Sequence, residues 1–159
     1  MLNGYGENSP LSAYGPTVLR LALAAVFIAH GAQKLFGIWG GGGLTGTAAF
    51  FAQLGLEPAY PLAVVAGIVE CGGGLLLLLG AYTQIASALL AVQMLTAIWT
   101  VHLPAGFFLP NGYEFPLTLI GALVCLMLSG AGALSLDARR ASHAAAAAAG
   151  RARLRAGKV

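Results

Sequence analysis

Four apolar segments, each long enough to cross a lipid bilayer, constrain this chain more than any other feature of its sequence. They cover residues 17–38, 59–79, 82–103 and 115–136, and a membrane-spanning helix needs roughly 20 residues. Only 8% of the 159 residues are charged, which is too few to cover the surface of a soluble domain of this size. The sequence therefore excludes a soluble globule and predicts a chain that lies in a membrane.

Helices are the expected spanning elements. The strict alternation of polar and apolar residues that is typical of a membrane barrel is absent from the four segments. A chain that does not form a barrel satisfies its backbone polar groups in lipid only as helices. We therefore expect an all-α integral membrane protein that forms a four-helix bundle. The connection at Gly80 is so short that the second and third helices should be antiparallel neighbours.

A short helix is expected in the first outer loop, over residues 44–55. Thr45 or Thr47 is suited to cap its N-terminus and Gly55 to end it. The segment is too short to cross the bilayer, so it should lie at the outer interface. The apolar side chains that would either anchor it there or close over the mouth of the bundle are Phe50, Phe51 and Leu54.

The distribution of cations predicts the topology. Six of the eight Lys and Arg residues follow the fourth segment, which places the C-terminus in the cytoplasm, and four spans then place the N-terminus there too. The chain divides into a cytoplasmic segment 1–16, a spanning domain 17–137 and a basic tail 138–159. Reading Arg20 and residues 21–29 as a cleaved signal peptide is disfavoured, because residues 1–16 contain no cation.

The basic tail combines a run of alanines with clustered arginines. It should either fray in water or lie against anionic lipid through its arginines. Because the basic character of the chain belongs to this tail, it indicates contact with lipid and not with nucleic acid.

Ionisable residues inside the spans are the strongest functional signal, because each is costly in lipid and needs a partner. On the first span Arg20 and Lys34 lie on one helical stripe, with His30 one turn before Lys34. Arg20 either reaches the inner headgroups or has a role in the bundle. Glu70 lies eleven residues from Ala59, about 16 Å deep at 1.5 Å per residue.

Small residues beside Glu70 should permit a close approach of another helix. They are Gly67, Cys71 and Gly74. Antiparallel packing would bring either His30 or Lys34 to the carboxylate. Such a pair either fixes the register of the helices or belongs to a functional site.

Further polar residues complete the candidate set. Gln93 is expected to bond another helix, whereas His102 is typical of an interfacial histidine. Glu114, with Glu57, Lys34 and His102, would line an outward-opening polar vestibule above Glu70. The primary candidates for a ligand or proton site are His30, Lys34, Glu70 and Glu114, and the secondary candidates are Arg20, Gln33, Gln93 and His102.

Several motifs are absent from the sequence. Cys71 and Cys125 are isolated, with no C-x-x-C pair, and they are expected either to pack as small apolar residues or to pair directly. No phosphate loop, nucleophile elbow or zinc spacing occurs, so we expect no metal and find no self-contained catalytic motif. The two histidines within the spans lie at different depths, which argues against haem as a cofactor.

The ordered motifs resemble those of the DoxX family. They are Arg20, HGAQKLFG at residues 30–37, ECGG at 70–73, GYEFPL at 112–117 and GAGALSLD at 130–137. The resemblance implies a small bacterial inner-membrane protein with four helices. Some members of that family are subunits of thiosulfate:quinone oxidoreductases, and others belong to oxidoreductase complexes. The residues that the motifs carry over are Arg20, His30, Lys34, Glu70 and Glu114.

Three hypotheses follow. The first is a membrane subunit of a redox or stress-response system that binds a quinone or a sulfur species between its helices. The second is a scaffold that anchors partner proteins or copies of itself, with buried charges that only fix helix register. The third, a small transporter, would need internal repeats or broken helices, and the sequence establishes neither.

The topology is tested by periplasm-specific labelling of single introduced cysteines. We expect a cysteine at Asn111 to react and one at Ala149 to be protected, because the two positions lie on opposite sides of the membrane. Labelling at Ala149 in intact cells would contradict the assignment.

Overall fold

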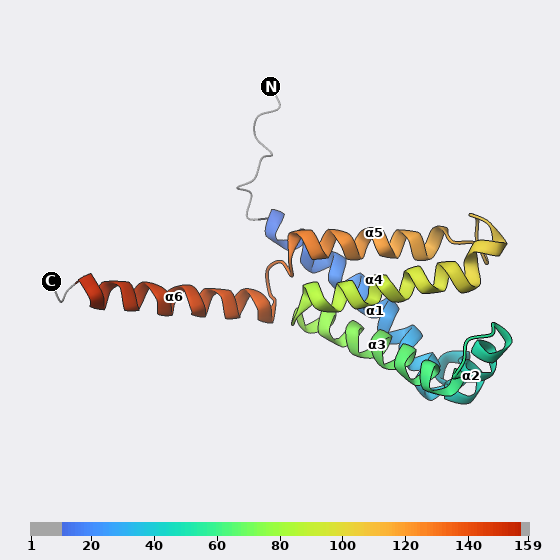
Figure 1. Cartoon of the computed structure of the whole chain (residues 1–159). Helices are drawn as coiled ribbons and strands as arrows, with labels where there is room; N and C mark the ends of the chain where they lie inside the picture. The colour runs from blue at the N-terminus through green and yellow to red at the C-terminus, as the bar shows by residue number, and fades with distance from the viewer. Residues whose placement is uncertain (1–10, 157–159) are drawn as a thin grey trace, which may run out of the picture.

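The computed structural model describes residues 11–156, and these contain helices and no strands. The elements in chain order are η1 (Ser12–Tyr14), α1 (Gly15–Phe36), η2 (Ile38–Gly40), α2 (Gly43–Gln53), α3 (Ala59–Leu79), α4 (Thr83–Ala97), η3 (Ile98–His102), η4 (Leu103–Ala105), α5 (Glu114–Ser129) and α6 (Leu136–Ala156). The all-α prediction is confirmed. Figure 1 shows α1, α3, α4 and α5 gathered together, with α2 and α6 at opposite ends of that group.

Three helical stretches are long and apolar enough to cross a membrane: Ser12–Phe36, Ala59–Leu79 and Thr83–Ala105. The fourth expected span is shorter in the structure, because α5 ends at Ser129 and not at residue 136. Gly130 and Gly132 have positive φ angles of 78° and 70°, and such a backbone cannot continue a right-handed helix. The 16 residues of α5 measure about 24 Å at 1.5 Å per residue.

Glycines bring α1 and α3 into backbone contact. A Cβ atom on Gly31 would collide with the backbone of Cys71, and one on Gly74 would lie 2.8 Å from the backbone nitrogen of Ile28. Gly31 thus lies beside Cys71, and Ile28 lies beside Gly74. Residue numbers rise along α1 while they fall along α3, so the two helices are antiparallel. The small residues beside Glu70 therefore permit the predicted close approach.

The apolar core lies where α1, α3, α4 and α5 meet. Its fully buried side chains include Phe27, Leu77, Leu90, Leu123 and Leu126. Apolar side chains also cover much of the outer surface, where Leu79, Ile85 and Leu128 are exposed. This distribution suits a bundle that is surrounded by lipid.

Arg20 is buried and does not reach the headgroups. Its side chain is 2% exposed. Its guanidinium donates hydrogen bonds to the carbonyl oxygens of Leu77 (2.8 Å), Leu78 (2.6 Å), Ala131 (3.1 Å) and Leu134 (2.9 Å). The last carbonyls of a helix lack partners within it, so Arg20 satisfies the end of α3 and ties it to the loop before α6.

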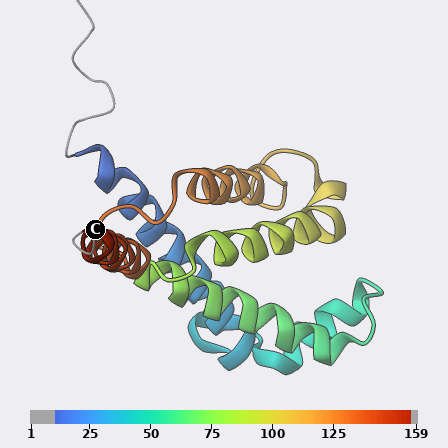
Figure 2. The ribbon, with the colours of Figure 1, turned by 60° about the vertical axis from the view of Figure 1, so that its left-hand side comes forward.

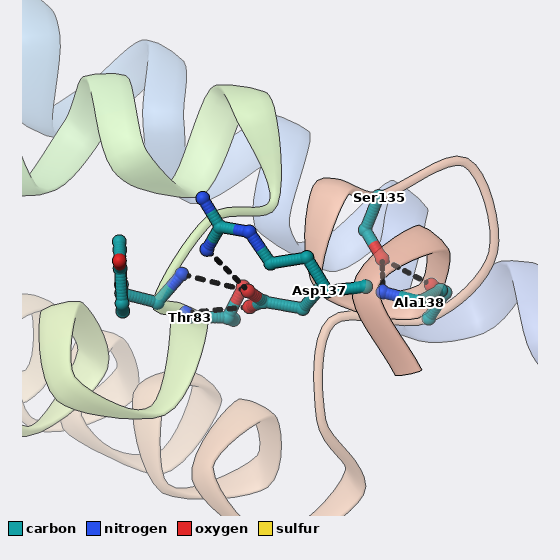
Figure 3. Close-up of polar contacts among 7 residues, drawn as sticks. Thr83, Ser135, Asp137 and Ala138 are labelled. Atoms are coloured by element: carbon teal, nitrogen blue, oxygen red, sulfur yellow. Dashed lines mark hydrogen bonds and ion pairs between the residues drawn. The ribbon is translucent and has the colours of Figure 1, made fainter. Parts of the chain in front are cut away.

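Asp137 fixes the start of α6 on the bundle. Its carboxylate accepts hydrogen bonds from the amides of Tyr82 and Thr83, each at 2.9 Å, and the Ser135 hydroxyl accepts one from the amide of Ala138 at 3.1 Å (Figure 3). Burial by itself would raise the pKa of Asp137. The amides of Thr83 and Tyr82 and the charge of Arg140 outweigh burial, so the pKa lies below its ordinary value.

Three finer expectations need correction. The tail does not fray after Asp137, because α6 continues as one helix to Ala156 and projects away from the bundle (Figures 1 and 2). Thr45 and Thr47 lie inside α2, whose N-cap is Gly42 and has no side-chain hydrogen bond. Cys71 and Cys125 are free, so they do not form the direct pair.

Replacement of Asp137 by Asn should lower the stability of the detergent-solubilised protein by about 1 kcal/mol at neutral pH, because α4 loses a charged cap. The wild-type protein should lose this contribution as the pH falls below about 4, since its lowered pKa makes the ionised carboxylate the stabilising form. The variant should show a weaker pH dependence. Thermal unfolding between pH 3 and 7 measures both effects.

Ser142→Ala is the matched control for this experiment. Its hydroxyl bonds only within α6, to the carbonyl oxygen of Arg139, so this variant should unfold as the wild type does. Equal stability of Asp137→Asn and the wild type at pH 7 would show that the cap contributes nothing.

Candidate functional site

A cavity of about 510 Å³ lies between the ends of α1, α3, α4 and α5 on the side of α2. Most of its walls are apolar, and Phe50, Phe51 and Leu56 contribute to them from α2 and the following loop. The phenylalanines of α2 therefore lie over the bundle, which is one of the two positions expected for them. The ionisable or amide side chains that line the cavity are His30, Lys34, Glu70, Gln93 and His102.

An ion pair between Lys34 and Glu70 forms part of the cavity wall. The Lys34 Nζ lies 2.5 Å from the Glu70 Oε2, and the side chains are 26% and 4% exposed. The backbone contact at Gly31 and Cys71 sets this register, since Lys34 and Glu70 lie beside it on the two antiparallel helices. Of the two partners that the sequence allowed for Glu70, the structure selects Lys34.

Gln93 extends the pair to a third helix. Its Nε2 donates hydrogen bonds to the Glu70 Oε1 at 2.9 Å and to the carbonyl oxygen of Ala66 at 3.1 Å. The expected bond from Gln93 to another helix is therefore present. Both oxygens of the buried Glu70 carboxylate have a donor, which is the condition under which a buried charge is tolerated.

Two histidines stand on the cavity wall outside this network. His30 lies one turn before Lys34 on α1. His102 ends the π-helical segment η3, and its Nδ1 lies 2.8 Å from the carbonyl oxygen of Asn111. A carbonyl accepts only from a protonated nitrogen, so in the neutral ring the Nε2 of His102 is the acceptor.

The other predicted site residues do not line the cavity. Glu114 accepts a hydrogen bond from the amide of Leu109 at 2.7 Å, and Glu57 accepts one from the amide of Ala59 at 2.8 Å. Gln33 donates to the carbonyl oxygen of Trp39 at 3.1 Å, and Arg20 lies at the opposite end of α1. These four side chains hold loops and helix ends.

Sequence reasoning missed two polar residues of the wall, Thr96 and Thr100. Gln93, Thr96 and Thr100 recur at intervals of three and four residues, and this helical stripe was the available signal. The π-helical conformation of residues Ile98–His102, which include Thr100, had no signal in the sequence. Within residues 11–156 no group of three or more His, Cys, Asp and Glu side chains is arranged to hold a metal ion.

The fold and the cavity define a helical membrane protein with a buried ion pair beside a largely apolar pocket. Comparison with known proteins identifies the family of this protein. The DoxX family model matches residues 15–103, which include α1 to α4 with the ion pair and Gln93. The chain belongs to the DoxX family.

Three relatives illustrate this family. The chain is 35% identical to the Bacillus subtilis protein named "Putative oxidoreductase CatD", over 77% of this chain and 84% of that protein. It is 32% identical to an uncharacterized membrane protein of Mycobacterium tuberculosis, over 86% and 89% of the two chains. It is 29% identical to the inner membrane protein YphA of Escherichia coli, over 77% and 87%. No solved structure matches.

Removal of one partner of the buried pair should cost more stability than removal of both. We expect Lys34→Met to lower the stability by about 3 kcal/mol, because it leaves Glu70 without its counter-charge. The double variant Lys34→Met/Glu70→Gln should recover a large part of this loss. Thermal unfolding in detergent measures the three proteins, and a double variant less stable than Lys34→Met would show that the charges are not coupled.

Proposed function

We propose that this membrane protein is a subunit of a redox or stress-response system and that its cavity binds a quinone. The observation that carries the proposal is the position of the Lys34–Glu70 pair at the wall of a largely apolar cavity. The name of the Bacillus subtilis relative, "Putative oxidoreductase CatD", supports the redox assignment.

The size and chemistry of the cavity favour a small amphipathic ligand. Ligand pockets commonly measure roughly 300–1,000 Å³ and combine apolar walls with few polar groups, and the cavity of about 510 Å³ falls in this range. The ring of a quinone would contact the apolar walls. Its carbonyl oxygens would accept hydrogen bonds, and Lys34 is the strongest donor on the wall.

Charge favours a quinone over an anionic sulfur species. Glu70 neutralises Lys34, so the pair presents no net charge to a ligand. Moving an anion such as thiosulfate from water into apolar surroundings is costly without a counter-charge. A neutral quinone avoids this cost, and electrons would be exchanged with it by a partner protein.

The second candidate function is a scaffold, and the geometry of Arg20 favours it. Arg20 donates four hydrogen bonds to backbone carbonyls and so holds helix ends in place. In a scaffold the Lys34–Glu70 pair would likewise only fix the register of the helices. In both cases we place the protein in the bacterial inner membrane with both termini in the cytoplasm, on the basis of the arginines after α5.

Quinone binding is tested by filling the cavity. Ala97 lines the cavity, whereas Ala25 lies on the exposed face of α1 and gives a matched control. A short-chain benzoquinone should raise the unfolding temperature of the wild type and of Ala25→Phe, because a ligand that binds only the folded state stabilises it. Ala97→Phe should lose at least 80% of this shift, since the ring occupies the binding space.

Three outcomes would count against the proposal. A full shift in Ala97→Phe would place the quinone elsewhere, and no shift in the wild type would favour the scaffold. If thiosulfate raises the unfolding temperature of the wild type and the quinone does not, the ligand of the cavity would be an anion and not a neutral quinone. Glu70→Gln adds a further readout: it should unfold at a lower temperature than the wild type, because Lys34 loses its counter-charge. If the quinone then gives this folded variant no shift, the pair serves the ligand and not only the register.

A further inference from the structure

A second hollow lies at the end of the bundle opposite the cavity. Arg139, Arg140 and His143 line a hollow there together with Leu136. All four residues belong to the first turns of α6, which starts where the bundle ends (Figures 1 and 2). The proposed quinone site does not use any of them.

The hollow is held in place by the contacts that anchor α6. Asp137 and Ser135 fix the first turn through hydrogen bonds to Thr83, Tyr82 and Ala138 (Figure 3). The Arg140 guanidinium lies 4.7 Å from the centre of the Tyr82 ring and 3.7 Å from the Asp137 carboxylate. Arg140 is therefore positioned at the hollow before any ligand arrives.

Within residues 11–156, the positive charge of this region has a single acidic partner. Asp137 is the single acidic residue of α6, and two backbone amides and Arg140 already share its carboxylate. Arg139 is exposed one position before Arg140. Two guanidinium groups beside a histidine form a site for an anion with several oxygens, such as a phosphate group.

Exposed apolar side chains lie in the segments that lead up to and contact the start of α6. Leu79 ends α3 with 55% of its surface exposed, Tyr82 is 56% exposed, and Leu134 in the loop before α6 is 76% exposed. In a membrane such side chains contact acyl chains, and arginines immediately beyond them lie at headgroup level. A ligand that matches both parts has an anionic head and an apolar tail.

We propose that the hollow formed by Leu136, Arg139, Arg140 and His143 binds the headgroup of an anionic phospholipid. The phosphate accepts hydrogen bonds from the two arginines, and the acyl chains lie along the exposed leucines of α3 and of the loop before α6. Bound lipid stabilises the junction between the bundle and α6.

The test is lipid binding to the detergent-solubilised full chain, measured by native mass spectrometry with dioleoyl phosphatidylglycerol and dioleoyl phosphatidylcholine. Arg139→Gln/Arg140→Gln should bind phosphatidylglycerol about 30-fold more weakly than the wild type, since each arginine near an anionic surface contributes about fivefold. Phosphatidylcholine should bind the two proteins equally.

Arg151→Gln/Arg153→Gln is the matched control. It removes the same charge from the same helix, twelve residues further along, and should change phosphatidylglycerol binding less than threefold. Equal losses in the two double variants would overturn the site, because they would show a general effect of charge.

Two more measurements keep the proposal falsifiable. Arg140 also contacts Tyr82 and Asp137, so Arg139→Gln/His143→Gln tests the hollow with those contacts intact, and we expect at least fivefold weaker binding at unchanged thermal stability. Glycerol phosphate, which has the head without the chains, should not displace the lipid at millimolar concentration. Displacement would show a site for free phosphate and overturn the lipid assignment.

Discussion

The backbone contact between α1 and α3 is the constraint on which the rest of the structure depends. Gly31 and Gly74 let the two helices approach until no side chain separates them, and their antiparallel register then determines which polar groups meet. In a bilayer no water is available to satisfy a misplaced charge. A larger residue at Gly31 would therefore separate the helices and disturb the Lys34–Glu70 pair beside them.

The two ends of this helix pair use their charges differently. At one end Arg20 is surrounded by backbone carbonyls and bonds four of them, so it closes the bundle and joins α3 to the loop before α6. At the other end Lys34 keeps part of its surface exposed and faces a cavity. A buried cation whose hydrogen-bond donors are all bonded to the backbone stabilises the fold, whereas a cation at a cavity wall can also bind a ligand. This difference separates Arg20 from the proposed quinone site.

The cavity exists because α2 and α5 cover the helix pair incompletely. α5 packs against α4 and α1, and α2 packs against α3 and α1 and brings Phe50 and Phe51 to the opening. The family match covers the helices that hold the polar network and ends before α5. The polar network is thus held by the charged helix pair with α4, while α5 and α6 add the remaining wall and the basic arm.

The sequence by itself determined the helical class, the membrane, the costly charges at Arg20, Lys34 and Glu70, and the small residues that let helices approach. These follow because a bilayer imposes segment length and penalises every buried charge. Only the tertiary structure decided that Glu70 pairs with Lys34 and not with His30, that Arg20 turns inward, and that Glu114 bonds a loop amide away from the cavity. Such choices depend on helix rotation and loop conformation, which are set by packing between segments far apart in the chain and leave no local pattern.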